Sequence, residues 1–256
     1  MSNTILLLRS LPLDRDARSS KMVAEYQRRG YKVKVAVWSR GQPLEDLPDQ
    51  FVCQTPGGYG RKLRGINARL SWMWFLAKIM VRCRRNYDII HVVDLDTGII
   101  GVPLGRLLGK FIIYDAFDHI AAMVGEGFFG RLLASVERVM IKKATIAIFP
   151  DPIRLTQYGI PLTGAVSIVG NIPDLPDARR QPRKMADGRL RLVYIGTLEA
   201  THRGLEYLTD LAKSHPDSLE VIVGGMGELH EYFERESARI PNLSYLGQLA
   251  YDEAWR

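Results

Sequence analysis

The fold is decided by residues 4–38, TILLLRSLPLDRDARSSKMVAEYQRRGYKVKVAVW. Residues 4–9 and 32–38 are short, mostly apolar runs, which are typical of strands in the middle of a parallel sheet. Asp16 can cap a helix between these runs, and Gly30 can end that helix in the left-handed conformation. The segment therefore predicts a strand, a helix and a second strand.

The same alternation continues through the rest of the chain. Further strands are predicted at 89–93, 111–114, 145–149 and 166–169. After a segment rich in proline and charge, a second series follows, with strands at 190–195, 219–223 and 243–246 and helices at 205–213 and 228–239. Because parallel strands need crossover helices, this order predicts an α/β chain with two Rossmann-like domains.

We expect an N-terminal domain at 1–170, a linker at 171–189 and a C-terminal domain at 190–256. The linker has little to bury, since seven charged residues lie between 174 and 187 beside three prolines. The second domain stops where its next helix should start. It is therefore expected to be incomplete, and the chain to be a fragment of a longer protein.

Composition excludes several classes of protein. No apolar run approaches the roughly 18 residues that a membrane-spanning helix needs, and residues 1–9 lack the basic start of a signal peptide. Cys53 and Cys83 form no CxxC pair and have no nearby histidine, so neither a disulfide framework nor a zinc site is predicted. A soluble, cytoplasmic protein without a metal is expected.

Charge is divided unevenly along the chain. Residues 1–170 contain 24 Lys and Arg against 14 Asp and Glu, whereas 171–256 contain 11 against 14. The first part is therefore expected to meet something anionic, which can be a lipid surface, a phosphorylated substrate or nucleic acid. A nucleic-acid-binding module is a third hypothesis beside the two functions given below. No RNA-binding signature or recognition helix in the sequence supports it.

The loop after the first strand of the chain has no glycine, which excludes the dinucleotide fingerprint of NAD and FAD enzymes.

Two strand-to-helix loops of the second domain carry the features of an anion site. Residues 224–228, GGMGE, instead place bare backbone amides before a helix, where they can hold a phosphate. The alternative is a tight turn that needs glycine for its conformation alone.

Arg203 stands at the start of the predicted helix 205–213, where a cation is unfavourable unless an anion joins it. Both loops follow strand carboxyl ends, where α/β proteins bind ligands. We therefore predict that the loops around Arg203 and Gly227 hold a pyrophosphate together.

The chain resembles the retaining glycosyltransferases of family 4 almost from end to end. The segments that carry the resemblance are DRDAR at 14–18, YDIIHVVDLD at 87–96, IIYDAFD at 112–118, NIPD at 171–174, YIGTLEATHRG at 194–204, GGMGE at 224–228 and YLGQL at 245–249. The resemblance implies the GT-B fold and a nucleoside-diphosphate sugar as donor, without a cofactor. It also implies transfer to a glycan or lipid-linked acceptor with retention of configuration.

The resemblance assigns candidate roles to individual residues. The family's arginine and lysine for the donor diphosphate fall on Thr197 and Arg203, and its histidine near the sugar falls on Phe117, so that Asp118 and His119 become the catalytic candidates. The donor-binding candidates are Gly196, Thr197, Arg203, Gly224, Gly225, Gly227, Glu228, Gly247 and Gln248. The acceptor-side candidates are Asp14, Arg15, Arg18 and Asp94.

The departures from the family pattern keep a second function open. Thr197 offers one hydroxyl where the family has an arginine. The family's Glu-x7-Glu motif is expected downstream of Asp252 and Glu253, and the given sequence ends before it. A non-catalytic subunit that binds nucleotide sugars is the alternative.

The segment 61–87 contains eight basic residues and no acidic one. Helical spacing predicts that one face of it packs on the sheet, formed by Leu70, Met73, Trp74, Ala77, Met80 and Val81. Trp72, Phe75 and Ile79 are then left for the surface. A basic helix with spare aromatics indicates peripheral binding to an anionic membrane, which for this chain would be the inner face of the plasma membrane.

Overall fold

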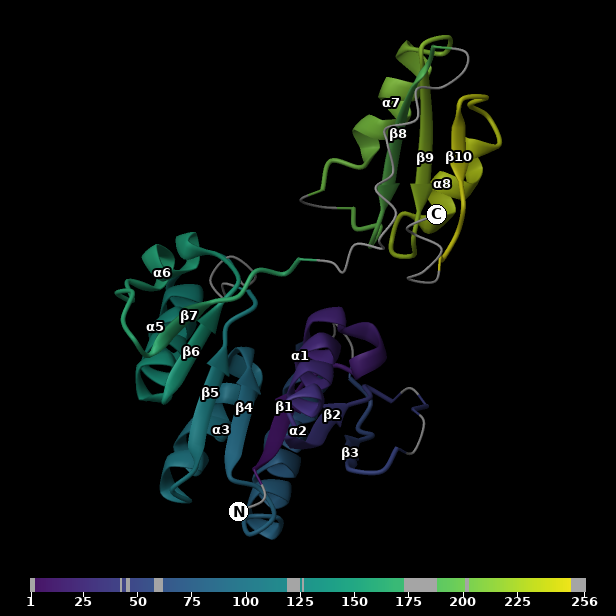
Figure 1. Ribbon diagram of the computed structural model, residues 1–256. Coiled ribbons are helices and arrows are strands. Elements are labelled where there is room, and N and C mark those ends of the chain that lie inside the picture. The colour runs from purple at the N-terminus through teal and green to yellow at the C-terminus, as the bar shows by residue number, and fades with distance from the viewer. Residues whose placement is uncertain are drawn as a thin grey trace. The chain divides into compact units, whose positions relative to one another are not determined.

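The computed structural model describes residues 3–41, 43–44, 47–57, 62–118, 125, 127–172, 188–200 and 203–249, with only the backbone for 62–65. The chain divides into two compact units, Met1–Pro173 (unit 1) and Asp174–Arg256 (unit 2), which are described separately (Figure 1). Most of the linker predicted at 171–189 lies outside the described residues.

Unit 1 is built on a seven-stranded parallel sheet with the order β3-β2-β1-β4-β5-β6-β7 (Figure 1). The strands are β1 (Thr4–Arg9), β2 (Lys32–Trp38), β3 (Gln50–Cys53), β4 (Ile89–Val93), β5 (Phe111–Asp115), β6 (Ile146–Phe149) and β7 (Val166–Ile168). Strand order reverses between β1 and β4, which pair with Leu7 opposite His91. Such a reversal creates the crevice in which doubly wound sheets bind ligands.

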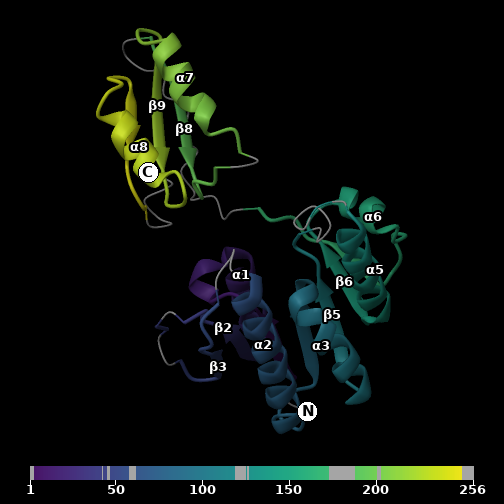
Figure 2. The ribbon, with the colours of Figure 1, turned by 180° about the vertical axis from the view of Figure 1, so that it is seen from behind.

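Helices cover both faces of this sheet. They are η1 (Leu13–Arg15), α1 (Ala17–Arg28), α2 (Lys62–Arg82), α3 (Asp94–Leu107), α5 (Phe128–Lys143) and α6 (Pro152–Tyr158). Figure 2 shows α2, α3 and α5 side by side on one face, in agreement with the contacts between them. Leu6 and Leu8 of β1 point into the core beneath these helices, whereas Leu7 belongs to the cluster beneath α1.

The predicted start and end of α1 are confirmed. The Asp16 carboxylate accepts a hydrogen bond from the Ser19 amide at 3.1 Å, which caps the helix. Gly30 lies just beyond the helix at φ +83°, the left-handed conformation that glycine adopts without strain.

The prediction of which face of α2 packs on the sheet is wrong for most residues. Trp72 is 1% exposed and stacks between Trp38 and Phe75, with ring centroids 5.9 and 5.7 Å away. Trp74 is instead 74% exposed, and Leu70 and Val81 also face solvent. Because α2 is apolar on two sides, periodicity alone could not tell which stripe faces the sheet.

Unit 2 is a three-stranded parallel sheet with the order β10-β9-β8. Its elements are β8 (Leu190–Ile195), α7 (Glu206–Ser214), β9 (Leu219–Gly224), α8 (His230–Ser237) and β10 (Leu243–Tyr245). The core lies between sheet and helices and includes Leu205, Val221, Val223 and Phe233. The predicted α/β class with two Rossmann-like parts is therefore confirmed.

None of the helices in the described part of the chain is long and apolar enough to cross a bilayer.

Candidate functional site

The carboxyl edge of the unit 1 sheet collects charged side chains at the strand reversal. Arg9 ends β1, Asp94 follows β4, and Asp115 ends β5. Arg9 joins two carboxylates, since its Nε contacts Asp16 and its Nη1 donates to Asp94 Oδ2 at 3.0 Å. The topology thus brings together residues that are 7 and 85 positions apart.

Asp94, an acceptor-side candidate, has an unusual backbone and an unusual carboxyl group. Its φ is +60°, in the left-handed region that residues other than glycine rarely adopt. Residues held in such a conformation cluster at functional sites. Asp94 Oδ1 accepts hydrogen bonds from the amides of Phe117 at 2.7 Å and Asp118 at 3.3 Å. Burial raises the pKa of Asp94 to about 7 against the opposing pull of Arg9, and Asp96 adds to the rise. A carboxyl that titrates near neutral pH suits an acid–base or hydrogen-bonding role.

The raised pKa of Asp94 predicts a pH-dependent stability. The folded state binds the proton more tightly than the unfolded state does, so this contribution to stability is full below the ordinary pKa of 3.8 and is lost as the pH rises through about 7. Three pH units correspond to ~4 kcal/mol. In urea unfolding from pH 4 to 8, we expect the free energy of unfolding of the parent to fall by up to that amount relative to Asp94→Asn, which cannot titrate. The exposed Asp14→Asn variant is the control, and parallel profiles for parent and Asp94→Asn would contradict the raised pKa.

Arg18, another acceptor-side candidate, is buried in a second ionic group beside the first. Its Nη2 donates to Asp115 Oδ1 at 2.8 Å and its Nη1 to the Val169 carbonyl at 2.6 Å. His91 Nε2 lies 3.6 Å from Asp115 Oδ2, and the guanidinium groups of Arg9 and Arg18 lie 4.7 and 4.8 Å from the Phe117 ring centre. Arg18 therefore ties α1 to β5 and to the segment after β7.

The other candidates of unit 1 lie at the surface or outside the described residues. Asp14 and Arg15 are exposed in η1, 4.0 Å apart. Asp118 is exposed, and its carbonyl accepts a hydrogen bond from the Tyr158 hydroxyl at 3.2 Å. His119 lies outside the described residues, so its catalytic role stays a prediction.

Arg9, Asp16 and Asp115 were not among the candidates from sequence. The signal available in the sequence was the charged Arg9 at the end of an otherwise apolar strand, TILLLR.

In unit 2, the two strand-to-helix loops predicted to hold the pyrophosphate lie side by side at the carboxyl edge of the sheet. The Leu198 amide donates to the Met226 carbonyl, and the Leu229 amide donates to the Leu198 carbonyl, both at 3.0 Å. The Gly225 amide donates to the Gly247 carbonyl at 2.7 Å, which adds the loop after β10. The three loops that carry the donor-binding candidates therefore form one connected edge.

The glycine conformations have a structural reason within unit 2. Gly225 has φ +134°, and a Cβ there would lie 1.8 Å from the Gly196 carbonyl oxygen. Gly227 has φ +155°, and a Cβ there would lie 2.4 Å from the Leu198 carbonyl oxygen. Glycine is thus required for the two loops to touch, whether or not a ligand binds.

Free amides remain at this edge. Within the described residues, the amides of Met226, Gly227 and Glu228 donate no hydrogen bond, and they lead into α8. Glu228 Oε2 accepts from the Ala200 amide at 3.4 Å, and Gln248 is exposed. Successive free amides before a helix are the arrangement that binds phosphate groups.

Arg203 differs from its expected position in one respect. Since α7 begins at Glu206, Arg203 stands in the preceding turn rather than at the helix end. Its Nε donates to Glu199 Oε2 at 3.0 Å, a hydrogen bond that raises the pKa of the guanidinium, and its side chain is 45% exposed. Glu199 is thus the anion beside this cation. Thr197, the second residue after β8, is exposed at the same edge.

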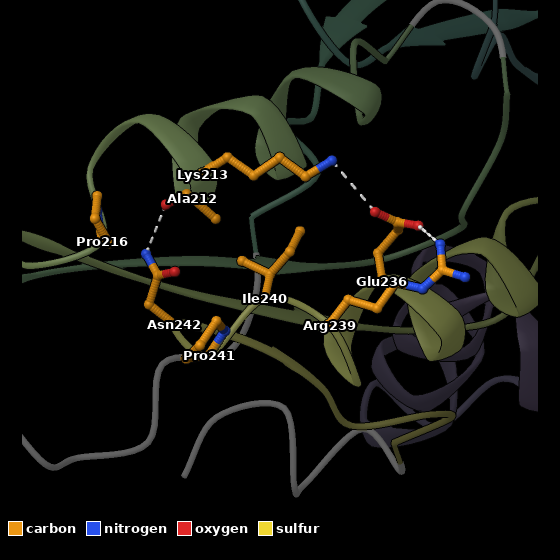
Figure 3. A pocket seen from close by; sticks show the side chains of 8 residues that line it. All are labelled: Ala212, Lys213, Pro216, Glu236, Arg239, Ile240, Pro241 and Asn242. Carbon is orange, nitrogen blue, oxygen red and sulfur yellow. Dashed lines mark hydrogen bonds and ion pairs between the residues drawn. The ribbon is translucent and has the colours of Figure 1, made fainter.

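A separate hollow of about 420 Å³ lies at the opposite, amino edge of the unit 2 sheet (Figure 3). Lys213 and Arg239 both pair with Glu236 there, at 3.3 and 3.5 Å. Asn242 donates to the carbonyls of Ala212 and Leu219 at 2.9 and 2.8 Å, which joins the end of α7 to β9. The charged groups of the hollow are thus paired with one another, and its lining shares no residue with the glycine edge.

No group of three or more His, Cys, Asp or Glu side chains suited to a metal ion occurs among the described residues. The acid-rich edge of unit 1 is held together by arginines instead.

Comparison with known proteins identifies the fold. No family model matches the sequence, and no curated protein matches it either. Similar solved structures include sucrose-phosphate synthase from Thermosynechococcus elongatus, 13% identical with a TM-score of 0.69 over 99% of this chain and 72% of that one. Anabaena HepE with UDP and glucose is 15% identical with a TM-score of 0.66, over 97% and 70%. The lipopolysaccharide outer core galactosyltransferase WaaB is 12% identical with a TM-score of 0.60, over 97% and 69%.

The fold is therefore of the GT-B type. At these identities the likeness concerns the fold and leaves the reaction to be argued from the residues.

Proposed function

We propose that this protein transfers a sugar from a nucleoside-diphosphate sugar to a glycan or lipid-linked acceptor, with retention of configuration. The observation that carries the proposal is the connected carboxyl edge of unit 2, where the loop after β9 offers three free amides and the loop after β8 carries the exposed Arg203. The solved structure of HepE with UDP and glucose supports a nucleotide-sugar donor for this fold.

In the proposed reaction, the bond between the anomeric carbon and the β-phosphate oxygen breaks. The acceptor oxygen bonds to that carbon on the same face of the sugar, and the acceptor proton passes to the leaving phosphate oxygen. Negative charge develops on the leaving diphosphate. Arg203 and the amides of residues 226–228 would stabilise that charge, as preorganised donors do at other sites where charge develops.

Substitution of Arg203 tests the donor site. Loss of one charged hydrogen bond to the diphosphate is expected to weaken binding of UDP or GDP about 10- to 100-fold in Arg203→Ala, measured by isothermal titration. Arg191→Ala is the matched control, because Arg191 is also an exposed arginine of unit 2, paired with Glu220 at 2.7 Å. Equal affinity of the two variants, or no binding of either nucleotide by the parent, would remove the proposed site.

The alternative function is a non-catalytic subunit that binds nucleotide sugars, and Thr197 favours it, since a hydroxyl is a weaker partner for a diphosphate than a guanidinium. Titration combined with an assay of donor hydrolysis and transfer separates the two. Binding without turnover identifies the binding subunit. Turnover supports the transferase, and NMR of the product then reads the anomeric configuration, which retention requires to be unchanged. We place this activity in the cytoplasm.

A further inference from the structure

We propose that the outward face of α2 binds the surface of an anionic lipid bilayer. This α2 surface consists of the exposed apolar side chains Ile66, Leu70, Trp74 and Val81 and the basic side chains Arg69, Lys78 and Arg82. The inference concerns where the protein works, and it does not depend on the sugar chemistry of unit 2.

The apolar side chains form one stripe on the helix. At about 100° per residue, Ile66, Leu70, Trp74 and Val81 fall within an arc of roughly 80°. Their exposed fractions are 54, 58, 74 and 44%. Trp72, Leu76 and Met80, each at most 1% exposed, lie outside this arc and fix the helix in the core. Within the part of unit 1 that the structure describes, the stripe therefore lies on the solvent side of α2.

Cations flank the stripe on both sides. By the same helical geometry, Lys78 and Arg82 lie beyond one edge of the arc and Arg69 beyond the other. Within the described residues, none of these three forms an ion pair, and no acidic residue occurs between 61 and 87. Arg84 and Arg85 extend the basic region beyond the end of the helix.

This arrangement fits a bilayer surface. A helix that lies in the plane of a membrane buries an apolar stripe among the acyl chains and places cations at the level of anionic headgroups. Tryptophan is favoured at that interface because its ring is both apolar and able to donate a hydrogen bond. The combination of an exposed tryptophan with unpaired cations on both sides gives charge complementarity to anionic lipid.

Cosedimentation of the full chain with vesicles tests the proposal. Vesicles of phosphatidylcholine alone and of phosphatidylcholine with about one third phosphatidylglycerol would be compared at low and high salt. We expect binding to the anionic vesicles only, weakened by salt. Lys78→Gln with Arg82→Gln should lower the partition coefficient about 30-fold, and Trp74→Ala at least about tenfold.

Matched controls keep charge and hydrophobicity changes comparable. Lys142→Gln with Lys143→Gln removes two exposed cations from α5, and Leu107→Ala removes a side chain that is 81% exposed on α3. Both should bind vesicles like the parent. Equal loss in control and test variants, or equal binding to neutral and anionic vesicles, would overturn the proposal. So would self-association without lipid that Trp74→Ala abolishes, because the surface would then serve a second copy of the chain.

Discussion

Gly225→Ala is expected to unfold unit 2. The new Cβ would lie 1.8 Å from the Gly196 carbonyl oxygen, and the residue would have to keep φ +134°. The obstacle is backbone that cannot move aside, since the Gly196 amide itself donates to the Gly224 carbonyl at 3.0 Å. We expect a loss of more than about 4 kcal/mol, most of the stability of a unit of this size. Nucleotide binding should be lost with it.

The matched control is Gly188→Ala, because Gly188 has φ +76° but no atom within 4 Å of the added Cβ. That variant should lose only about 1 kcal/mol from backbone strain. Denaturation followed by circular dichroism would show one cooperative transition missing in Gly225→Ala while the transition of unit 1 remains. If the two alanine variants were equally stable, that result would contradict the close contact between the loops after β8 and β9.

Asp115→Ala is expected to destabilise unit 1 by about 3–5 kcal/mol, the usual effect of leaving one member of a buried ion pair without its partner. The side chain of Asp115 is 0% exposed and that of Arg18 is 7% exposed. Without Asp115, the Val169 carbonyl is the one hydrogen-bond acceptor left to the Arg18 guanidinium among the residues that the structure describes. Urea unfolding would measure the loss.

Two further variants identify the cause of that loss. Replacing both partners, Arg18→Met with Asp115→Val, should recover most of the stability, because no charge is then left buried. Glu25→Ala removes an ion pair with Arg28 on the solvent side of α1, where the Glu25 side chain is 38% exposed, and should change the unfolding transition little. If the double variant were as unstable as Asp115→Ala, the loss of stability would come from the change in side-chain volume and not from the unpaired charge.

The order of strands and helices could be predicted from the sequence because its signals are local. Strands β1, β2, β4 and β8 have the predicted bounds, and Asp16 and Gly30 lie at the predicted ends of α1. An apolar run, a capping carboxylate and a glycine act within a few residues of themselves. The edge strand β3 was missed because only Cys53 of its four residues is buried, so it has no clear apolar pattern.

The candidate site was predictable in part for the same reason. The glycines at 224, 225 and 227 and the position of Arg203 could be read from two loops that each follow a strand. The pairing of Arg203 with Glu199, four residues earlier, was not predicted.

The sequence by itself determined the α/β class, the succession of elements and the glycine-containing loops after β8 and β9, because these depend on interactions between near neighbours in the chain. The tertiary structure alone decided that Trp72 is buried and Trp74 exposed, that Arg9 meets Asp94, and that burial raises the pKa of that carboxyl to about 7. Packing against distant segments and removal of water are properties of the assembled sheet, and no short stretch of sequence encodes them.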